Sequence, residues 1–230
     1  MIRCILLDLD GTLVNTWDLY VEAYIRALEP HLGHRLNLEE LIRLRPNSEL
    51  RLLQRGAGGA DAQRAYGEFL RHYGSLHRTH FGGVYPGVRE MLAALRSRRL
   101  SIGIVTGKSR GAWEITAAET DLGPFDVVVT DEDVAEAKPD PAGLILALDR
   151  LAVAAGQAVY VGDTVADAKA ALAAGVRFAA ALWPKSETEL GGFMTQVREV
   201  GVWAELPNPG SLVAALTDYP HMAASPLREP

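Results

Sequence analysis

The stretch that decides the fold lies near the N-terminus, where residues 4–14 read CILLDLDGTLV. Residues 4–7 are apolar, which predicts a short buried β-strand. Two carboxylates, Asp8 and Asp10, follow it, and Gly11 is the turn residue at which the chain leaves the strand. Because Asp8 and Asp10 are two residues apart, both carboxylates can reach one pocket at the end of the strand.

Other short apolar runs along the chain also end in polar side chains. They are residues 101–105 before Thr106, 127–129 before Thr130 and 158–161 before Asp163. A further run, residues 178–183, follows Gly175, and helical stretches lie between the runs. This alternation predicts an α/β fold, a Rossmann-like doubly wound parallel sheet with helices on both faces. Such sheets bind ligands beyond the carboxyl ends of their strands, where Asp8, Thr106 and Asp163 fall.

Residues 15–83 interrupt this alternation. They contain no strand candidate and instead show amphipathic helices, one of which carries Trp17, Tyr20 and Tyr24 on one face. We therefore expect a catalytic core of residues 1–14 and 84–230 with a helical insertion of residues 15–83. An insertion directly after the first strand lies above the strand ends, where it can act as a lid.

Composition and charge narrow the classes of function. The chain has 230 residues, of which 48% are hydrophobic, enough for one core and a small second domain. Its formal charge of −6 and its pI near 5.5 provide no basic field for nucleic acid or for an anionic membrane surface. No apolar stretch approaches the roughly 20 residues of a membrane span, so we expect a cytoplasmic protein. The single cysteine, Cys4, is expected in the core.

The polar residues at the strand ends suit phosphoryl transfer. A carboxylate such as Asp8 that attacks a phosphoryl group needs positive charge to screen the repulsion, and an acid/base such as Asp10 to manage protons. Thr106 and Gly107 offer a hydroxyl and a flexible backbone for phosphate oxygens. Lys138, which lies in a proline-rich segment, offers the positive charge.

Two further carboxylates follow the run at residues 158–161. Asp163 stands directly at the predicted strand end, and Asp167 lies about one helical turn further on. Carboxylate oxygens are ligands that Mg²⁺ prefers in proteins. Together with Asp8, these residues predict a site for one magnesium ion.

These motifs, in this order, strongly resemble those of the haloacid dehalogenase-like hydrolase superfamily, and the resemblance covers nearly the whole chain. Residues 8–14, DLDGTLV, followed by a helical insertion, look like the phosphoglycolate phosphatase and β-phosphoglucomutase-like subgroup. Residues 85–88, YPGV, and 138–141, KPDP, add to the match. The resemblance implies that residues 15–83 are a helical cap of the C1 type.

The resemblance also implies a role for each matching residue. Asp8 would be the nucleophile that forms an aspartyl-phosphate, and Asp10 would protonate the leaving group and then activate water. Thr106, with Gly107, would bind the transferring phosphate. Lys138 would neutralise the phosphate and the nucleophile.

The same resemblance implies magnesium as the cofactor. Asp8, Asp163 and the backbone carbonyl of Asp10 would be its protein ligands, and Asp167 would support the metal site or Lys138. Asn15 departs from the family pattern, because aspartate is common there; asparagine keeps the oxygen but lacks the charge. The expected partner is a small phosphorylated metabolite, while its identity and the oligomeric state stay open.

Other functions of this fold make different demands. A dehalogenase needs no second aspartate, so Asp10 counts against it, and a phosphonatase needs a cap lysine, which residues 15–83 lack. A sugar phosphate mutase uses the same core and is the alternative to a phosphatase. A catalytically inactive binding protein is the alternative from another class, but such proteins usually lose one of the carboxylates that this chain retains.

Some residues of the insertion carry weaker signals. Arg43 and Arg45 flank a loop and would either contact the substrate or be solvated. Five histidines lie in the insertion, and His77 and His80 are close enough on a helix to share a metal. No third ligand accompanies this pair, and solvated histidines on helices are common.

Overall fold

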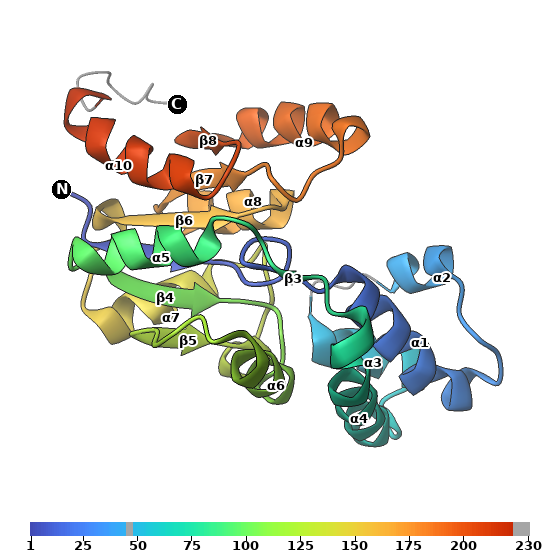
Figure 1. The fold of residues 1–230 in the computed structure, drawn as a ribbon. Helices are drawn as coiled ribbons and strands as arrows, with labels where there is room; N and C mark the ends of the chain where they lie inside the picture. The colour runs from blue at the N-terminus through green and yellow to red at the C-terminus, as the bar shows by residue number, and fades with distance from the viewer. Residues whose placement is uncertain (45–47, 223–230) are drawn as a thin grey trace.

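The computed structural model describes residues 1–44 and 48–222, and Figure 1 shows its ribbon. Six strands form one sheet in the order β5-β4-β1-β6-β7-β8, and all neighbouring pairs are parallel. The strands are β1 (Cys4–Leu7), β4 (Ser101–Val105), β5 (Val127–Val129), β6 (Ala158–Gly162), β7 (Arg177–Ala181) and β8 (Ala204–Leu206). The predicted α/β fold with a doubly wound parallel sheet is confirmed.

The strand order reverses at β1. From β1 the chain moves to β4 and β5 on one side of it, and then to β6, β7 and β8 on the other. The carboxyl end of β1 therefore lies between those of β4 and β6. This is the position at which doubly wound sheets bind their ligands.

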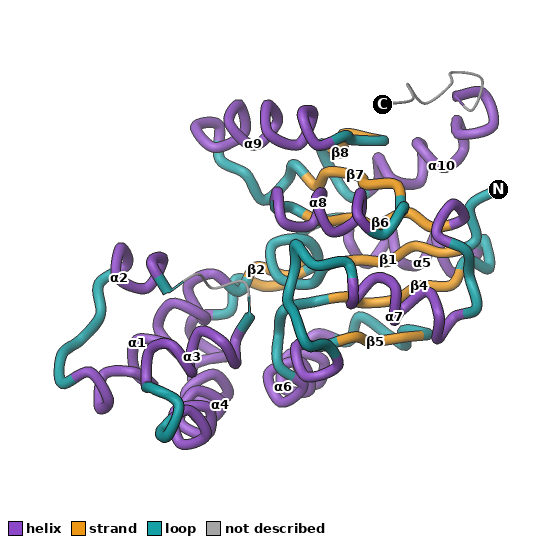
Figure 2. Tube along the Cα trace, turned by 180° about the vertical axis from the view of Figure 1, so that it is seen from behind, coloured by secondary structure: helices purple, strands orange, loops and turns teal. Residues whose placement is uncertain are grey.

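Helices cover both faces of the sheet. They are α5 (Val88–Ser97), α6 (Arg110–Thr120), α7 (Ala142–Leu151), α8 (Val165–Ala173), α9 (Glu187–Val200) and α10 (Gly210–Met222). Ile5 and Leu7 of β1 pack with residues of α5 and α10, on the face toward the viewer in Figure 1. Cys4 and Leu6 point to the opposite face and pack with α7, α8 and α9, which Figure 2 shows. Two buried faces explain why the strands read as continuous apolar runs.

One strand does not appear among the predicted runs. β8 has three residues and lies at the edge of the sheet, where Glu205 is exposed. A short edge strand buries little apolar surface, so it leaves little periodicity in the sequence. β7 ends at Ala181 and not at Trp183, which the apolar run had included.

Helices α1–α4 form a separate group, here called the helical unit, at one end of the sheet (Figure 1). Their bounds are α1 (Trp17–Leu32), α2 (Leu38–Arg43), α3 (Glu49–Ala57) and α4 (Ala62–His80). They bury a core of their own, to which Tyr24, Leu28, Leu52 and Phe69 contribute. Trp17 is an exception to the expected apolar face, because it begins α1 and is 53% exposed. Within the described helices, none is both long enough and apolar enough to cross a membrane.

Two short antiparallel strands connect the helical unit to the sheet. β2 (Val14–Asn15) leads into the unit and pairs with β3 (Gly83–Val84), which leads out of it. At Gly82 a Cβ atom would lie 2.7 Å from the Asn15 side chain, and Gly83 has a φ of +93°. A side chain at Gly82 would displace Asn15, and the φ of Gly83 lies in the left-handed region, so both positions favour glycine.

Candidate active site

Three polar side chains lie where the central strands end. Asp8 follows β1, Thr106 follows β4 and Asp163 follows β6, and each is 6% exposed. The backbone N–H of Asp8 donates to the Val161 carbonyl at 2.9 Å, and that of Thr106 donates to the Val129 carbonyl at 3.1 Å. Strand pairing therefore continues through Asp8 and Thr106 and fixes where their side chains begin.

Lys138 brings a positive charge to this edge of the sheet. Its Nζ lies 2.9 Å from Asp8 Oδ1 and 2.6 Å from Asp167 Oδ1, and it donates to the Tyr160 hydroxyl at 2.9 Å. The lysine side chain is 13% exposed, and those of Asp8 and Asp167 are 9% and 0% exposed. Lys138 thus bridges two carboxylates that would repel each other without it.

Tyr160 is a residue of this site that the sequence pattern does not reveal. Its side chain is fully buried in β6, and its hydroxyl lies 2.9 Å from Asp167 Oδ1 and 3.0 Å from the Val105 carbonyl. A buried tyrosine hydroxyl needs a hydrogen-bond partner. That rule predicts a polar neighbour for Tyr160, but it does not identify Lys138.

The start of α8 fixes the position of Asp167. Thr164 caps this helix: its backbone N–H donates to Asp167 Oδ2 at 3.0 Å, and the Asp167 N–H donates back to Thr164 Oγ1 at 3.2 Å. This reciprocal capping box turns the other carboxylate oxygen toward Lys138 and Tyr160. Both oxygens of Asp167 therefore already accept hydrogen bonds.

The carboxylates of this cluster differ in how burial and neighbours act on them. Burial raises the pKa of Asp8; Lys138 opposes this, and the Asp167 and Asp163 carboxylates add to it. Burial would also raise the pKa of Asp167, but Lys138 and hydrogen bonds from Lys138, Thr164 and Tyr160 lower it. Asp167 is therefore the preferred anion beside Lys138, while Asp8 needs further positive charge to be fully ionised.

The cluster has the donor set of a magnesium site. Asp8, Asp163 and Asp167 each offer a carboxylate oxygen, and these oxygens lie within 4.8 Å of one another. Asp163 packs against the backbone of Gly11, where a Cβ atom would lie 2.6 Å from Asp163 Oδ2 and where φ is +78°. Buried oxygen ligands without nitrogen or sulfur suit a hard divalent cation. Within the described part of the chain, this is the one cluster of three or more such ligands.

Lys185 is a second cation beside the cluster. Its Nζ lies 2.7 Å from Asp163 Oδ2, and its side chain is 18% exposed. It comes from the segment between β7 and α9, which the sequence analysis did not connect with the site. The hydroxyl of Thr12 donates to the other oxygen, Asp163 Oδ1, at 3.3 Å.

The side chain of Asp10 contacts a different set of residues. Its Oδ1 accepts from the Thr16 hydroxyl at 2.7 Å and lies 3.2 Å from Lys108 Nζ, and its Oδ2 accepts from the Tyr20 hydroxyl at 3.2 Å. Lys108 and Tyr20 were not among the predicted site residues. Lys108 stands two residues after Thr106, so its closeness to a strand end was the signal that could have found it.

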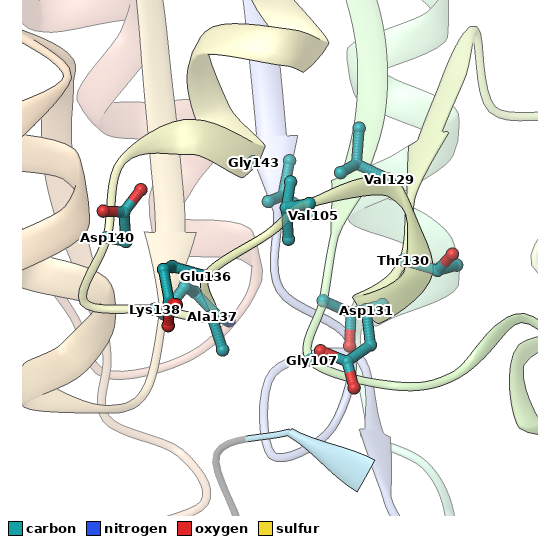
Figure 3. A pocket seen from close by; sticks show the side chains of 12 residues that line it. Val105, Gly107, Val129, Thr130, Asp131, Glu136, Ala137, Lys138, Asp140 and Gly143 are labelled. Atoms are coloured by element: carbon teal, nitrogen blue, oxygen red, sulfur yellow. The ribbon is translucent and has the colours of Figure 1, made fainter. Parts of the chain in front are cut away.

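A pocket adjoins the strand ends between the segments that follow β4 and β5 (Figure 3). Its lining includes Thr106, Gly107, Asp131 and Lys138, and Val105 and Val129 close its floor. The Thr106 hydroxyl, which accepts from the Lys108 N–H at 3.2 Å, is held at the edge of this pocket. The three residues predicted to bind phosphate, Thr106, Gly107 and Lys138, thus line one pocket.

The weaker candidates of the insertion lie elsewhere. The Arg43 side chain is 71% exposed on α2 and pairs with Glu39 at 2.5 Å, and Arg45 lies outside the described residues. His77 packs against Phe81 with ring centroids 4.4 Å apart. Among the described residues, neither His77 nor His80 belongs to a cluster of three potential metal ligands.

Comparisons with known proteins give consistent results. A family model described as haloacid dehalogenase-like hydrolase matches residues 5–181. The chain is 38% identical over 179 residues to a plasmid-encoded phosphoglycolate phosphatase of Cupriavidus necator, covering 75% of this chain and 77% of that one. It is 32% identical over 186 residues to the pyrophosphatase PpaX of Bacillus velezensis, covering 79% and 84%. CbbY of Rhodobacter sphaeroides, solved in complex with phosphate, shares the fold with a TM-score of 0.79 at 24% identity, over 94% and 100% of the two chains.

Proposed function

Because the chain belongs to the haloacid dehalogenase-like hydrolase family, we propose that it is a magnesium-dependent phosphatase that forms an aspartyl-phosphate on Asp8. The observation that carries this proposal is the environment of Asp8. Its carboxylate is buried at the switch point of the sheet, 2.9 Å from Lys138 and within 4.8 Å of the oxygens of Asp163 and Asp167. A buried nucleophile with a cation and oxygen ligands beside it suits attack on a phosphoryl group.

Lys138 and Thr106 are the groups that would hold the phosphate for this attack. The lysine screens the charge of Asp8 and of the phosphoryl oxygens, which otherwise repel each other. The Thr106 hydroxyl and the Gly107 backbone donate to those oxygens from the end of β4. Tyr160 and Asp167 hold Lys138 in place through contacts of 2.9 Å and 2.6 Å.

Mg²⁺ would be held by Asp8, Asp163 and the backbone carbonyl of Asp10. Asp167 would support these ligands. Both oxygens of Asp167 accept hydrogen bonds from Lys138, Tyr160 or Thr164, which favours a supporting role over direct ligation. When bound, the ion would neutralise charge on the carboxylates and on the phosphoryl oxygens. Burial raises the pKa of Asp8, so more positive charge beside this carboxylate would favour its ionised form. A bound Mg²⁺ would supply that charge.

Asp10 would act as the acid/base. It would give a proton to the leaving group as Asp8 bonds to phosphorus, and then take a proton from the water that hydrolyses the aspartyl-phosphate. Its carboxylate faces the helical unit through Tyr20, so the leaving group would lie on that side.

The division into domains follows from the same reasoning. Residues 1–14 and 84–230 would be the catalytic core, and residues 15–83 a C1-type cap that closes over the substrate and excludes water. The pairing of β2 with β3 supports this division, because it places the two segments that connect the helical unit to the core next to each other, as a hinge would require. An identical placement of the helical unit in the free protein and in a complex with magnesium and orthovanadate would refute closure.

The substrate would be a small phosphorylated metabolite. The two relatives compared above, at 38% and 32% identity, are named as a phosphoglycolate phosphatase and a pyrophosphatase, which favours hydrolysis over the sugar phosphate mutase alternative. The lysine-free segment 15–83 argues against phosphonatase chemistry. A catalytically inactive protein would have no use for the retained Asp8, Asp10 and Lys138.

The test is hydrolysis of 4-nitrophenyl phosphate with and without Mg²⁺. Removal of the nucleophile by Asp8→Asn should lower the magnesium-dependent rate by at least about 10⁴-fold. Asp149→Asn, which alters an exposed aspartate of α7, is the matched control and should leave the rate unchanged. Turnover that does not need magnesium, or that survives Asp8→Asn, would overturn the proposal.

A further inference from the structure

Lys108 is a buried lysine that the proposed reaction does not use. It follows the end of β4 by three residues, and its side chain is 0% exposed. The ammonium group lies between the core and the helical unit. Buried lysines are rare unless their charge is paired, so its partners identify what it does.

The ammonium group uses all of its donors within this interface. It donates to the Tyr20 hydroxyl at 2.7 Å and to the Tyr73 hydroxyl at 2.8 Å, and it lies 3.2 Å from Asp10 Oδ1. It also lies 4.2 Å and 4.6 Å from the ring centroids of Tyr20 and Tyr73. Since an ammonium has three donors, this set saturates it.

Glu49, the first residue of α3, provides the second carboxylate near Lys108. Its Oε1 lies 3.7 Å from Lys108 Nζ and accepts a hydrogen bond from the Tyr20 hydroxyl, while its Oε2 accepts from the Ser109 N–H at 2.9 Å. Its own N–H donates to the Gly107 carbonyl at 3.2 Å. Asp10 is the closer of the two carboxylates, so the lysine pairs first with Asp10.

Asp10 is thereby held at both of its oxygens. Thr16 and Lys108 contact Oδ1, and Tyr20 contacts Oδ2. Thr16 and Lys108 fix Oδ1, and the single hydroxyl proton of Tyr20 is shared between Asp10 Oδ2 and Glu49 Oε1, which together limit the rotation of the Asp10 carboxylate. Tyr20 belongs to α1 and Tyr73 to α4, so part of this arrangement exists only while the helical unit lies against the core.

We propose that Lys108 is a positioning residue: together with Tyr20 it orients the Asp10 carboxylate toward the leaving group, and it does so only when the helical unit is seated. This inference rests on the proposed phosphatase function and deepens it. It makes acid/base catalysis conditional on closure, because Asp10 loses its contact with Tyr20, and Lys108 loses both of its tyrosine partners, when α1 and α4 move away. The alternative is that Lys108 only stabilises the interface.

Leaving-group dependence separates these two roles. 4-Nitrophenolate leaves phosphorus readily without a proton, whereas phenolate, which has nearly the same shape, depends more on a general acid. A misplaced Asp10 therefore slows the first turnover of phenyl phosphate much more than that of 4-nitrophenyl phosphate. A loosened interface slows both by the same factor.

The experiment compares Lys108→Met with the unaltered protein in single-turnover release of each phenol, with Mg²⁺ present. We expect a loss of about 10²-fold for phenyl phosphate, within the range for general-acid catalysis, and a change below about threefold for 4-nitrophenyl phosphate. Tyr20→Phe should show the same selectivity with a smaller loss. Lys169→Met, at an exposed position of α8, is the control and should change neither rate.

A double variant guards against misfolding as the cause. Lys108→Met with Glu49→Gln also removes the carboxylate that Lys108→Met leaves buried without its cation, so it should melt at a higher temperature than Lys108→Met alone and still show the selective loss. Equal losses for both substrates, or recovery of the phenyl phosphate rate in the double variant, would overturn the positioning role. Absence of magnesium-dependent turnover in the unaltered protein would instead refute the phosphatase function, and with it this inference.

Discussion

At the scale of single residues, Lys185 is the contact with the clearest consequence for metal binding. Its ammonium lies 2.7 Å from Asp163 Oδ2, beside a carboxylate that would ligate Mg²⁺. Two cations near one carboxylate repel each other, and burial strengthens that repulsion relative to water. We therefore expect Lys185 to compete with a bound metal for Asp163 and to raise the magnesium concentration that the site requires.

Replacing this lysine should tighten metal binding. Lys185→Met keeps most of the length of the side chain and removes its charge, and we expect the dissociation constant for Mg²⁺ to fall by about three- to tenfold. Titration calorimetry with MgCl₂ measures this without relying on activity. Lys169→Met removes an exposed lysine and should leave the constant unchanged. Weaker binding by Lys185→Met would mean that Lys185 orients Asp163 for the metal and does not compete with it.

The residues of the site also show how far a sequence alone can go. Asp8, Thr106 and Asp163 could be found because each ends a short apolar run, and parallel strands bring such ends together. Tyr160 could not be found in this way, because it lies within an apolar run. Lys185 could not be found either, because its contact with Asp163 depends on the conformation of a loop. A short apolar run that ends in a polar residue reveals a strand end, whereas contacts between distant loops leave no pattern in the sequence.

At the scale of elements, the start of α3 joins the helical unit to the core. Asp131, which follows β5, accepts from the Ser48 hydroxyl at 2.6 Å, from the Leu50 N–H at 3.1 Å and from Arg51 at 3.0 Å. A carboxylate at a helix N-terminus satisfies N–H groups that have no partner within the helix. Here that carboxylate comes from the core, so this part of the stabilisation of the first turn of α3 exists only in contact with the core, whereas Ser48 caps the Arg51 N–H from within the helical unit.

Removal of this carboxylate should loosen α3 selectively. For Asp131→Ala we expect the opening free energy of the first turn of α3 to fall by about 1–3 kcal/mol, which is typical for lost hydrogen bonds to a buried charged group. Hydrogen–deuterium exchange at the Leu50 amide reports this opening. Asp149→Ala, on the exposed side of α7, is the control. If amides of β1 and β6 exchanged faster to the same extent, the contact would be stabilising the whole fold and not this junction.

The elements themselves divide into those that the sequence predicts and those that it does not. The central strands follow the apolar runs of the sequence, and α1 follows its helical periodicity; the parallel sheet was predicted because such runs alternate with helical stretches. The strand order was not, because which strand lies beside β1 depends on how helices pack across the sheet. The edge strand β8 was missed for its shortness.

At the scale of the whole molecule, a buried interface with several carboxylates links folding to pH. Glu49 is 2% exposed, and burial raises its pKa from 4.5 to about 7, opposed by Lys108 and by hydrogen bonds from Ser109 and Tyr20. A carboxyl group with a raised pKa binds a proton more tightly in the folded chain than in the unfolded one. Its contribution to stability is therefore complete below pH 4.5 and is lost as the pH rises through about 7.

The pH dependence of the Glu49 contribution predicts how Glu49→Gln behaves, because a neutral amide then replaces the carboxyl group. The variant should match the unaltered protein near pH 4.5 and gain stability over it as the pH rises, by up to about 3 kcal/mol at pH 8. Urea unfolding at a series of pH values measures the difference. Asp8 and Asp163, whose pKa values burial also raises, titrate alike in both proteins, so their effect cancels. Glu90→Gln, at an exposed position of α5, should show no such trend. A variant that instead loses stability above pH 7 would show that Lys108 holds Glu49 ionised, and that the helical unit is bound to the core by a buried ion pair.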